Sequence, residues 1–357
     1  MSEYLSRVAD TMVANALQSA GAVLIEGPKW CGKTWTARRL ARSVLFMQDP
    51  DESANHLRAA DVKPSLLLRG ETPRLIDEWQ MAPVLWDAVR FAVDQRGEVG
   101  QFILTGSAAP VDGATAHTGT GRIVRRKMRP MSLFESGEST GQVSLAALFE
   151  AGAEAEGTSS LTVEDLAAAL VRGGWPAAVG AGRAEAFRAV QDYVDAVIET
   201  DVSRVDGLEK NPSRVRSLLR SLARNVSTPA SITTLRADLS ADDSDVSEKT
   251  IALYLTALRR IHVVDDLPAW SPALRSKTVL RTAPTRHFVD PSIATAALRC
   301  PPARLLSDFN TFGLLFESLC VRDLRVYASA ADGEVYHFRD KSGLEADAVV
   351  QLADGRW

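Results

Sequence analysis

The chain has 357 residues, of which 46% are apolar and 24% are charged, and its formal net charge is -4. This length exceeds that of one average domain, and the composition is typical of a globular protein with a buried core. The negative net charge excludes binding to nucleic acid through overall basicity, so any such contact requires a local basic patch.

The cysteines and the apolar runs indicate the compartment. Cys31, Cys300 and Cys320 are few, scattered and odd in number, which predicts neither a disulfide framework nor a structural zinc site. The first residues lack a basic segment leading into an apolar core, and no run approaches the ~20 apolar residues of a membrane helix. We therefore expect a cytoplasmic protein in a reducing compartment, with no membrane segment.

The first elements in chain order surround a glycine-bounded loop. Helical spacing of apolar residues in 8–17 predicts a helix, the apolar run 22–25 predicts a strand, and residues 35–41 have a helical pattern. Between strand and helix lies a G-x-x-x-x-G-K-T motif, in which backbone N–H groups surround phosphates at the positive end of a helix. Its residues are Gly27, Pro28, Lys29, Trp30, Cys31, Gly32, Lys33 and Thr34. Lys33 is predicted to reach the outer phosphates and Thr34 to ligate Mg²⁺, whereas the alternative is an ordinary glycine-rich turn.

Two adjacent carboxylates follow at the end of a later strand. The apolar run 44–47 predicts a second strand, and alternation of helix and strand predicts a parallel α/β sheet. The next strand, within 73–80, ends in Asp77 and Glu78, which places them beside the phosphate loop at the carboxyl edge of the sheet. Asp77 is predicted to orient water on Mg²⁺ and Glu78 to polarise the attacking water. The alternative is a strand end with two solvated acids.

A further strand at 101–104 runs into Thr105, Gly106 and Ser107. The two hydroxyls are placed to contact the γ-phosphate or the attacking water, or they simply cap a glycine-containing turn. Farther along the chain, Arg122 follows a glycine, and residues 130–135 read Pro-Met-Ser-Leu-Phe-Glu.

Together these motifs resemble the AAA-type ATPases, and specifically the prokaryotic ATP-binding proteins whose C-terminal region belongs to the domain-of-unknown-function 4143 family (DUF4143). The likeness rests on residues 27–34, 75–78, 104–107, 121–122 and 130–135, and it extends to 173–176, 193–201 and 285–291. It implies ATP and Mg²⁺ as ligands and a homo-oligomer. It also implies that Arg122 is an arginine finger offered to a neighbouring subunit, although Arg122 could equally be an arginine that pairs with a surface acid.

Three helices in quick succession are predicted from Asn211 onward. Asn211 with Pro212 opens the first helix, Ser231 starts the second, and Ser247 caps the third. A short helix, a turn, a longer helix and a strand-like pair at 263–264 are the layout of a winged helix-turn-helix.

Contact of this module with DNA is one of two open possibilities. Ser247, Lys249 and Thr250 would face bases, and several basic residues could meet phosphates: Arg214, Arg216, Arg220, Arg224, Arg275, Lys277 and Arg281. Acids at the start of the third helix would repel a phosphate backbone: Asp242, Asp243, Asp245 and Glu248. Contact with a protein, or sensing of the nucleotide state, is the alternative use of the winged helix.

The C-terminal residues resemble the beginning of a restriction-endonuclease-like core. A predicted helix at 312–321 carries Glu317, and the second of two predicted strands, at 335–340 and 345–350, carries Asp347. These carboxylates would be metal ligands, since hard oxygen ligands suit Mg²⁺. The strand with an acid and a lysine that completes such a core is not found before Trp357, so we expect no nuclease activity from these residues.

The predicted fold class is therefore α/β: an AAA-like P-loop NTPase sheet, a winged helix-turn-helix, and an incomplete restriction-endonuclease-like α/β piece. The expected domains are the ATPase at 1–140, a helical connecting region at 141–205, the winged helix at 206–284 and the nuclease-like region at 285–357. The expected function is Mg-dependent binding and hydrolysis of ATP, coupled to the winged-helix and C-terminal regions. The alternative is a non-hydrolysing ATP switch that recruits DNA or a protein.

Overall fold

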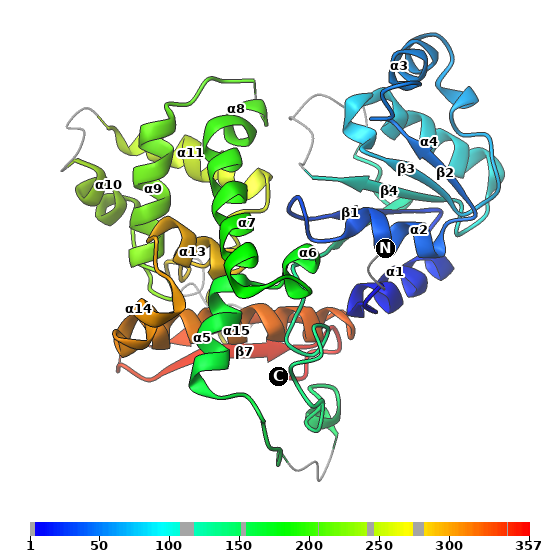
Figure 1. Ribbon diagram of the computed structural model, residues 1–357. Coiled ribbons are helices and arrows are strands. Elements are labelled where there is room, and N and C mark those ends of the chain that lie inside the picture. The colour runs from blue at the N-terminus through cyan, green and yellow to red at the C-terminus, as the bar shows by residue number, and fades with distance from the viewer. Residues whose placement is uncertain are drawn as a thin grey trace. The chain divides into compact units, whose positions relative to one another are not determined.

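The computed structural model describes residues 4–107, 118–150, 155–205, 207–240, 246–273, 282–340 and 342–357. The chain divides into two compact units, 1–128 and 129–357, which are drawn in Figure 1. The predicted domain boundaries at residues 140, 205 and 284 are finer than this division and stay predictions.

A five-stranded parallel sheet with the order β2-β3-β4-β1-β5 forms the centre of the first unit (Figure 1). Its register brings the carboxyl ends of neighbouring strands together, with Asp77 beside Thr105 and Glu26 beside Lys127. The predicted parallel α/β sheet is thereby confirmed. The strands are β1 (Ala22–Glu26), β2 (Ser43–Phe46), β3 (Arg74–Asp77), β4 (Phe102–Gly106) and β5 (Ile123–Lys127).

Helices cover both faces of this sheet, which explains why its central strands are continuous apolar runs. Along β1, Ala22 and Leu24 belong to one buried cluster, while Val23 and Ile25 belong to another. Successive strand residues point to opposite faces, so each face has its own core. The helices are α1 (Val8–Ser19), α2 (Lys33–Leu40), α3 (Ser53–Val62) and α4 (Val84–Arg96), with 3₁₀ turns at Pro64–Leu66 and Trp79–Met81.

The second unit is mainly helical, with one antiparallel pair of strands that packs on its longest helix. That helix is α15 (Phe309–Ser329), and the strands are β6 (Glu334–Arg339) and β7 (Glu345–Gln351). The other helices are α5 (Val163–Arg172), α6 (Pro176–Val179), α7 (Arg183–Ala196), α8 (Val202–Arg204), α9 (Pro212–Arg224), α10 (Ile232–Ser240), α11 (Glu248–Arg260), α13 (Pro291–Ala297) and α14 (Pro302–Leu306). A 3₁₀ turn at Ala147–Phe149 and a π-helical segment at Val197–Asp201 complete the unit's described helical elements.

The three helices predicted from residue 211 are present as α9, α10 and α11. The Asn211 side chain accepts hydrogen bonds from the backbone N–H groups of Ser213 and Arg214, and the Ser247 hydroxyl accepts one from Thr250 N–H. After α11, the described residues make isolated bridges, antiparallel between 264 and 288 and between 267 and 285, and parallel between 269 and 337. The winged helix therefore stays a prediction.

Part of the predicted nucleic-acid face lies outside the described residues, namely Asp242, Asp243, Asp245, Arg275, Lys277 and Arg281.

Among the residues that are described, no helix combines the length and the apolar character needed to cross a membrane.

Candidate nucleotide-binding site

The glycines of the loop between β1 and α2 are required by its geometry. A Cβ on Gly27 would lie 2.1 Å from the Met128 carbonyl oxygen, so no side chain fits there. Gly32, the residue before α2, has φ of 99°, a left-handed conformation that favours glycine. Trp30 also has a positive φ, 73°, although it is not glycine. The motif spacing is thus matched by a tight loop that ends at a helix N-terminus, where anions bind.

Lys33 extends back over this loop. Its side chain is buried, and its ammonium Nζ donates hydrogen bonds to the carbonyl oxygens of Gly27, at 3.0 Å, and Pro28, at 2.7 Å. The loop backbone therefore holds the positive charge of Lys33 at the N-terminus of α2. Within the same loop Cys31 is fully buried and its Sγ lies 3.7 Å from the Met128 carbonyl oxygen.

Asp77 is the centre of a group of polar side chains from three other segments. Its carboxylate, which is 1% exposed, accepts hydrogen bonds from Thr34 Oγ1 at 2.8 Å and Thr105 Oγ1 at 2.5 Å. Gln48 Nε2 donates to the other oxygen at 2.6 Å. A carboxylate beside a hydroxyl is the hard-oxygen donor set that Mg²⁺ prefers, so Thr34 and Asp77 fit this ion.

Gln48 is a member of this group that the sequence reasoning missed. It lies just beyond β2, whose last residue, Phe46, pairs with Asp77 across the sheet. The available signal was its position after a strand at the carboxyl edge, but a lone glutamine there has no motif around it.

Glu78 lies next to Asp77 in a strained conformation. Its φ of 56° is left-handed, which is uncommon outside glycine and clusters at functional sites. Burial raises the pKa of its carboxyl group and Asp77 raises it further, while the Lys33 ammonium opposes the rise. Gln80 Nε2 hydrogen-bonds to the Glu78 carboxylate, and sequence reasoning missed this contact as well.

The two predicted sensor hydroxyls have different surroundings. Thr105 is engaged with Asp77, so in this structure its hydroxyl orients the carboxylate. Ser107 is buried, just after the end of β4. Between them, a Cβ on Gly106 would lie 2.7 Å from Gln80 Oε1, so a side chain there would displace the end of the Gln80 side chain.

Arg122 lies at the opposite end of the sheet from the loop. The next residue, Ile123, pairs with Ala22 at the start of β1, whereas the loop follows the other end of that strand. Its guanidinium Nε donates to Asp94 Oδ1 at 2.7 Å, and the side chain is 46% exposed. Arg122 therefore cannot serve the loop of its own chain, and only the role in a neighbouring subunit stays a prediction.

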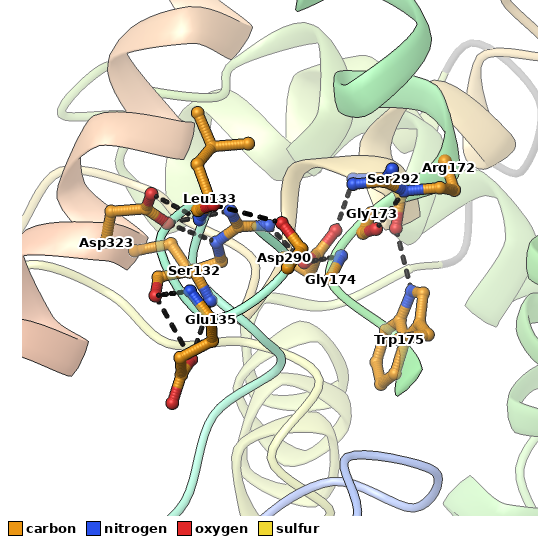
Figure 2. A network of polar contacts seen from close by, with 12 residues as sticks. Ser132, Leu133, Glu135, Arg172, Gly173, Gly174, Trp175, Asp290, Ser292 and Asp323 are labelled. Carbon is orange, nitrogen blue, oxygen red and sulfur yellow. Dashed lines mark hydrogen bonds and ion pairs between the residues drawn. The ribbon is translucent and has the colours of Figure 1, made fainter. Parts of the chain in front are cut away.

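A buried polar network in the second unit joins three of the motifs quoted for the family resemblance (Figure 2). Arg322, on α15, is 2% exposed and forms ion pairs with Asp290 and Asp323. Asp323 accepts a hydrogen bond from Leu133 N–H, and Asp290 accepts one from Gly174 N–H. Breaking a buried pair of this kind costs ~3–5 kcal/mol. The motifs at 130–135, 173–176 and 290–291 are thus part of the core of this unit.

The remaining predicted site residues do not form a complete site. Glu317 is half-buried on α15; burial and, secondarily, the Asp347 charge raise the pKa of its carboxyl group to about 7. The two negative charges therefore interact, but the described residues include no group of three or more potential metal ligands. On α9, Arg216 pairs with Asp195 and Glu199, and Arg224 with Asp238.

Comparisons with known proteins agree with the geometry of the first unit. Residues 19–136 match the model of a family described as an AAA domain. The Walker-type ATPase PABY2304 of Pyrococcus abyssi has a similar fold, with a TM-score of 0.50 and 13% identity, over 83% of this chain and 96% of that one. Together these findings support the class of an AAA-type ATP-binding protein.

The second unit matches a family of a different kind. Residues 163–304 match a model described as a domain of unknown function, DUF8612, so the resemblance to DUF4143 is not supported by this match.

The uncharacterized proteins Mb2031c of Mycobacterium bovis and Rv2008c of Mycobacterium tuberculosis are similar along nearly the whole chain. Each is 26% identical over 355 residues, covering 97% of this chain and 71% of the relative.

Proposed function

We propose that this chain is a cytoplasmic, Mg-dependent ATPase. The observation that carries the proposal is the group formed by Thr34, Asp77 and Thr105 beside the Lys33 ammonium and the Glu78 carboxyl. Phosphoryl transfer to water requires positioning and charge neutralisation more than covalent chemistry, and these residues supply both.

Each residue has a separate role in this proposal. Loop N–H groups and Lys33 bind the phosphates, for which the ammonium exchanges the Gly27 and Pro28 carbonyls for phosphate oxygens. Thr34 and Asp77 would hold Mg²⁺, which would supply positive charge to neutralise the phosphates. Glu78, whose pKa is raised by burial, accepts the proton of the attacking water. Gln80 holds that carboxylate in place.

Two substitutions test the assignment. Lys33→Ala is expected to weaken Mg·ATP binding by at least about tenfold, because a charge-assisted contact to phosphate is lost. Glu78→Gln is expected to preserve binding and lower kcat by about 100-fold or more, since the base is removed. Calorimetric titration and phosphate release measure the two effects, and Glu98→Gln, at an exposed acid of the same unit, is the control.

The outcomes separate hydrolysis from switching. If both variants release phosphate as fast as the wild type does, the proposed ATPase activity of this site is contradicted. Tight Mg·ATP binding by the wild type with no phosphate release instead supports the non-hydrolysing switch.

We also propose that nucleotide state is coupled to the second unit along the chain itself. Met128 N–H donates to the Glu26 carbonyl, and its own carbonyl oxygen packs against Gly27. The next residue, Arg129, forms an ion pair with Asp265 at 2.8 Å within the second unit. Met128, which contacts the loop, is therefore joined by a single peptide bond to Arg129, a residue anchored in the second unit. A movement of the loop can be passed on along the chain at this point.

The partner of the second unit is proposed to be a protein rather than DNA. Arg216 and Arg224 are neutralised by acids in the structure, which leaves less positive charge on α9 for phosphates. Salt-dependent binding of duplex DNA that is lost in Arg220→Glu would contradict this choice.

A further inference from the structure

The segment before α1 contacts the phosphate loop through a buried arginine. Arg7 is 6% exposed, and its guanidinium NH1 donates a hydrogen bond to the Cys31 carbonyl oxygen at 2.8 Å. Helices α1 and α2 lie side by side in the first unit (Figure 1), so an arginine at the start of α1 reaches the loop that precedes α2. Arg7 lies outside the phosphate-binding motif, and Cys31 occupies one of its unspecified positions.

The start of α1 is itself held in place by further hydrogen bonds. The Asp10 carboxylate accepts from Arg7 N–H at 3.0 Å and from the Tyr4 hydroxyl at 2.6 Å. The same hydroxyl lies 2.7 Å from Oγ1 of Thr36, a fully buried residue of α2. The Arg39 guanidinium packs over the Tyr4 ring, 4.5 Å from its centroid. The arginine is thus fixed relative to both the loop and the helix that follows it.

The contact determines the direction of one backbone donor. In a planar trans peptide the carbonyl and the N–H of the next residue point in opposite directions. The Cys31 carbonyl points to Arg7, so the Gly32 N–H points away from Arg7, at the N-terminus of α2. Gly32 is also in a left-handed conformation, with φ of 99°. Glycine adopts this conformation readily because it has no Cβ.

We infer that Arg7 is a positioning residue of the phosphate site, which presets the Gly32 N–H for a nucleotide phosphate by holding the Cys31 carbonyl. The inference rests on the proposed function, because it assigns a further residue to the same site. The ligand is the phosphate chain of ATP or ADP, and Arg7 acts on it through the loop backbone. Its buried positive charge also adds to the potential that attracts the anion.

The test compares Mg·ATP and Mg·ADP affinities by calorimetric titration. Arg7→Met is expected to raise the Kd for both nucleotides by about tenfold, because a hydrogen bond from a charged donor is lost and the loop peptide is released. Arg7→Lys keeps the charge and is expected to recover part of this affinity. Arg58→Met, at an exposed arginine of α3, removes the same charge from the same unit and is expected to change neither Kd.

A second control separates positioning from stability. Val89→Ala removes a buried side chain of α4 in the cluster on the other face of the sheet, which does not include Cys31, so it lowers the melting temperature without altering the packing around the loop. The inference is overturned if Arg7→Met binds as the wild type does, or if Val89→Ala loses as much affinity as Arg7→Met. If Arg7→Met does not fold, Arg7→Gln takes its place in the comparison, and wild-type affinity in that variant overturns the inference.

These results distinguish the inference from the proposed function. A wild-type chain that binds no Mg·ATP contradicts the proposed function itself. A wild-type chain that binds Mg·ATP, with Arg7→Met unchanged, contradicts the role of Arg7 alone.

Discussion

At the scale of single residues, a buried histidine makes the stability of the second unit depend on pH. The His287 ring hydrogen-bonds with Thr285 and Ser318 through its two nitrogens, at 3.1 and 3.2 Å. Burial, with smaller contributions from Arg325 and His337, lowers the pKa of this ring to about 3, although the Asp265 charge opposes the shift. The folded protein therefore keeps the imidazole neutral in mild acid, where the unfolded chain protonates it.

The sign of the pH dependence follows from this lowered pKa. The stabilising contribution is fully present above about pH 6.5 and is lost as pH falls, because only the unfolded state gains the proton. Between pH 7.5 and 5.5 the wild type should lose about 1.4 kcal/mol of unfolding free energy from this group. Urea unfolding of His287→Gln should lack that part of the loss, whereas equal losses in both proteins would contradict the assignment.

The residues of the nucleotide site differ in how far the sequence predicts them. Lys33, Thr34 and Asp77 follow from motif spacing, since a strand end and a helix N-terminus fix where their side chains lie. Arg7 and Gln48 contact the site across 24 and 29 residues of chain, respectively, without a local pattern. Such contacts depend on how helices and strands pack, which residue spacing does not specify.

At the scale of elements, the turn after α5 illustrates how closely two segments approach. A Cβ on Gly174 would lie 2.0 Å from the Met131 carbonyl oxygen, and Met131 N–H donates to the Gly174 carbonyl at 2.6 Å. Backbone meets backbone there, so a side chain would force the two segments apart.

Gly174→Ala is therefore expected to destabilise the second unit by about 3 kcal/mol or more, by displacing the segment that includes Met131. Gly180→Ala is the matched control, because a Cβ there has no atom within 4 Å and its φ is -92°. This control should be neutral or stabilising by up to about 1 kcal/mol. Thermal unfolding of the two variants measures the difference, and similar melting temperatures would contradict the close approach.

The sequence predicts most of the helices and strands, but it does not predict which residues these elements bring into contact. Buried parallel strands appear as apolar runs, and polar caps mark the starts of α9 and α11, so both types of element can be read from the sequence. The network around Arg322 joins residues 133, 174 and 290 on separate segments. Its arginine and Asp323 lie within a helix whose apolar pattern gives no sign of a buried ion pair.

At the scale of the whole molecule, the position of Arg122 bears on assembly. Its place at the amino end of β5, away from its own loop, means that a site completed by this arginine requires two chains. The surface pair with Asp94 contributes ~0–1 kcal/mol, so the guanidinium is readily released to a phosphate of a neighbour. A head-to-tail interface, which places one patch against a different patch, generates such sites.

Mixing two inactive variants tests this arrangement. Lys33→Ala lacks the phosphate-binding lysine and Arg122→Ala lacks the finger, but a head-to-tail pair of the two contains one site with both residues intact. Random mixing in equal amounts should restore about a quarter of the wild-type turnover, because one interface in four has the productive order. Native mass spectrometry with a slowly hydrolysed ATP analogue verifies that mixed assemblies form, and the doubly substituted chain mixed with Lys33→Ala should restore nothing. Mixed assemblies without recovered turnover, or an Arg122→Ala chain as active as the wild type, would leave Arg122 as a surface residue paired with Asp94.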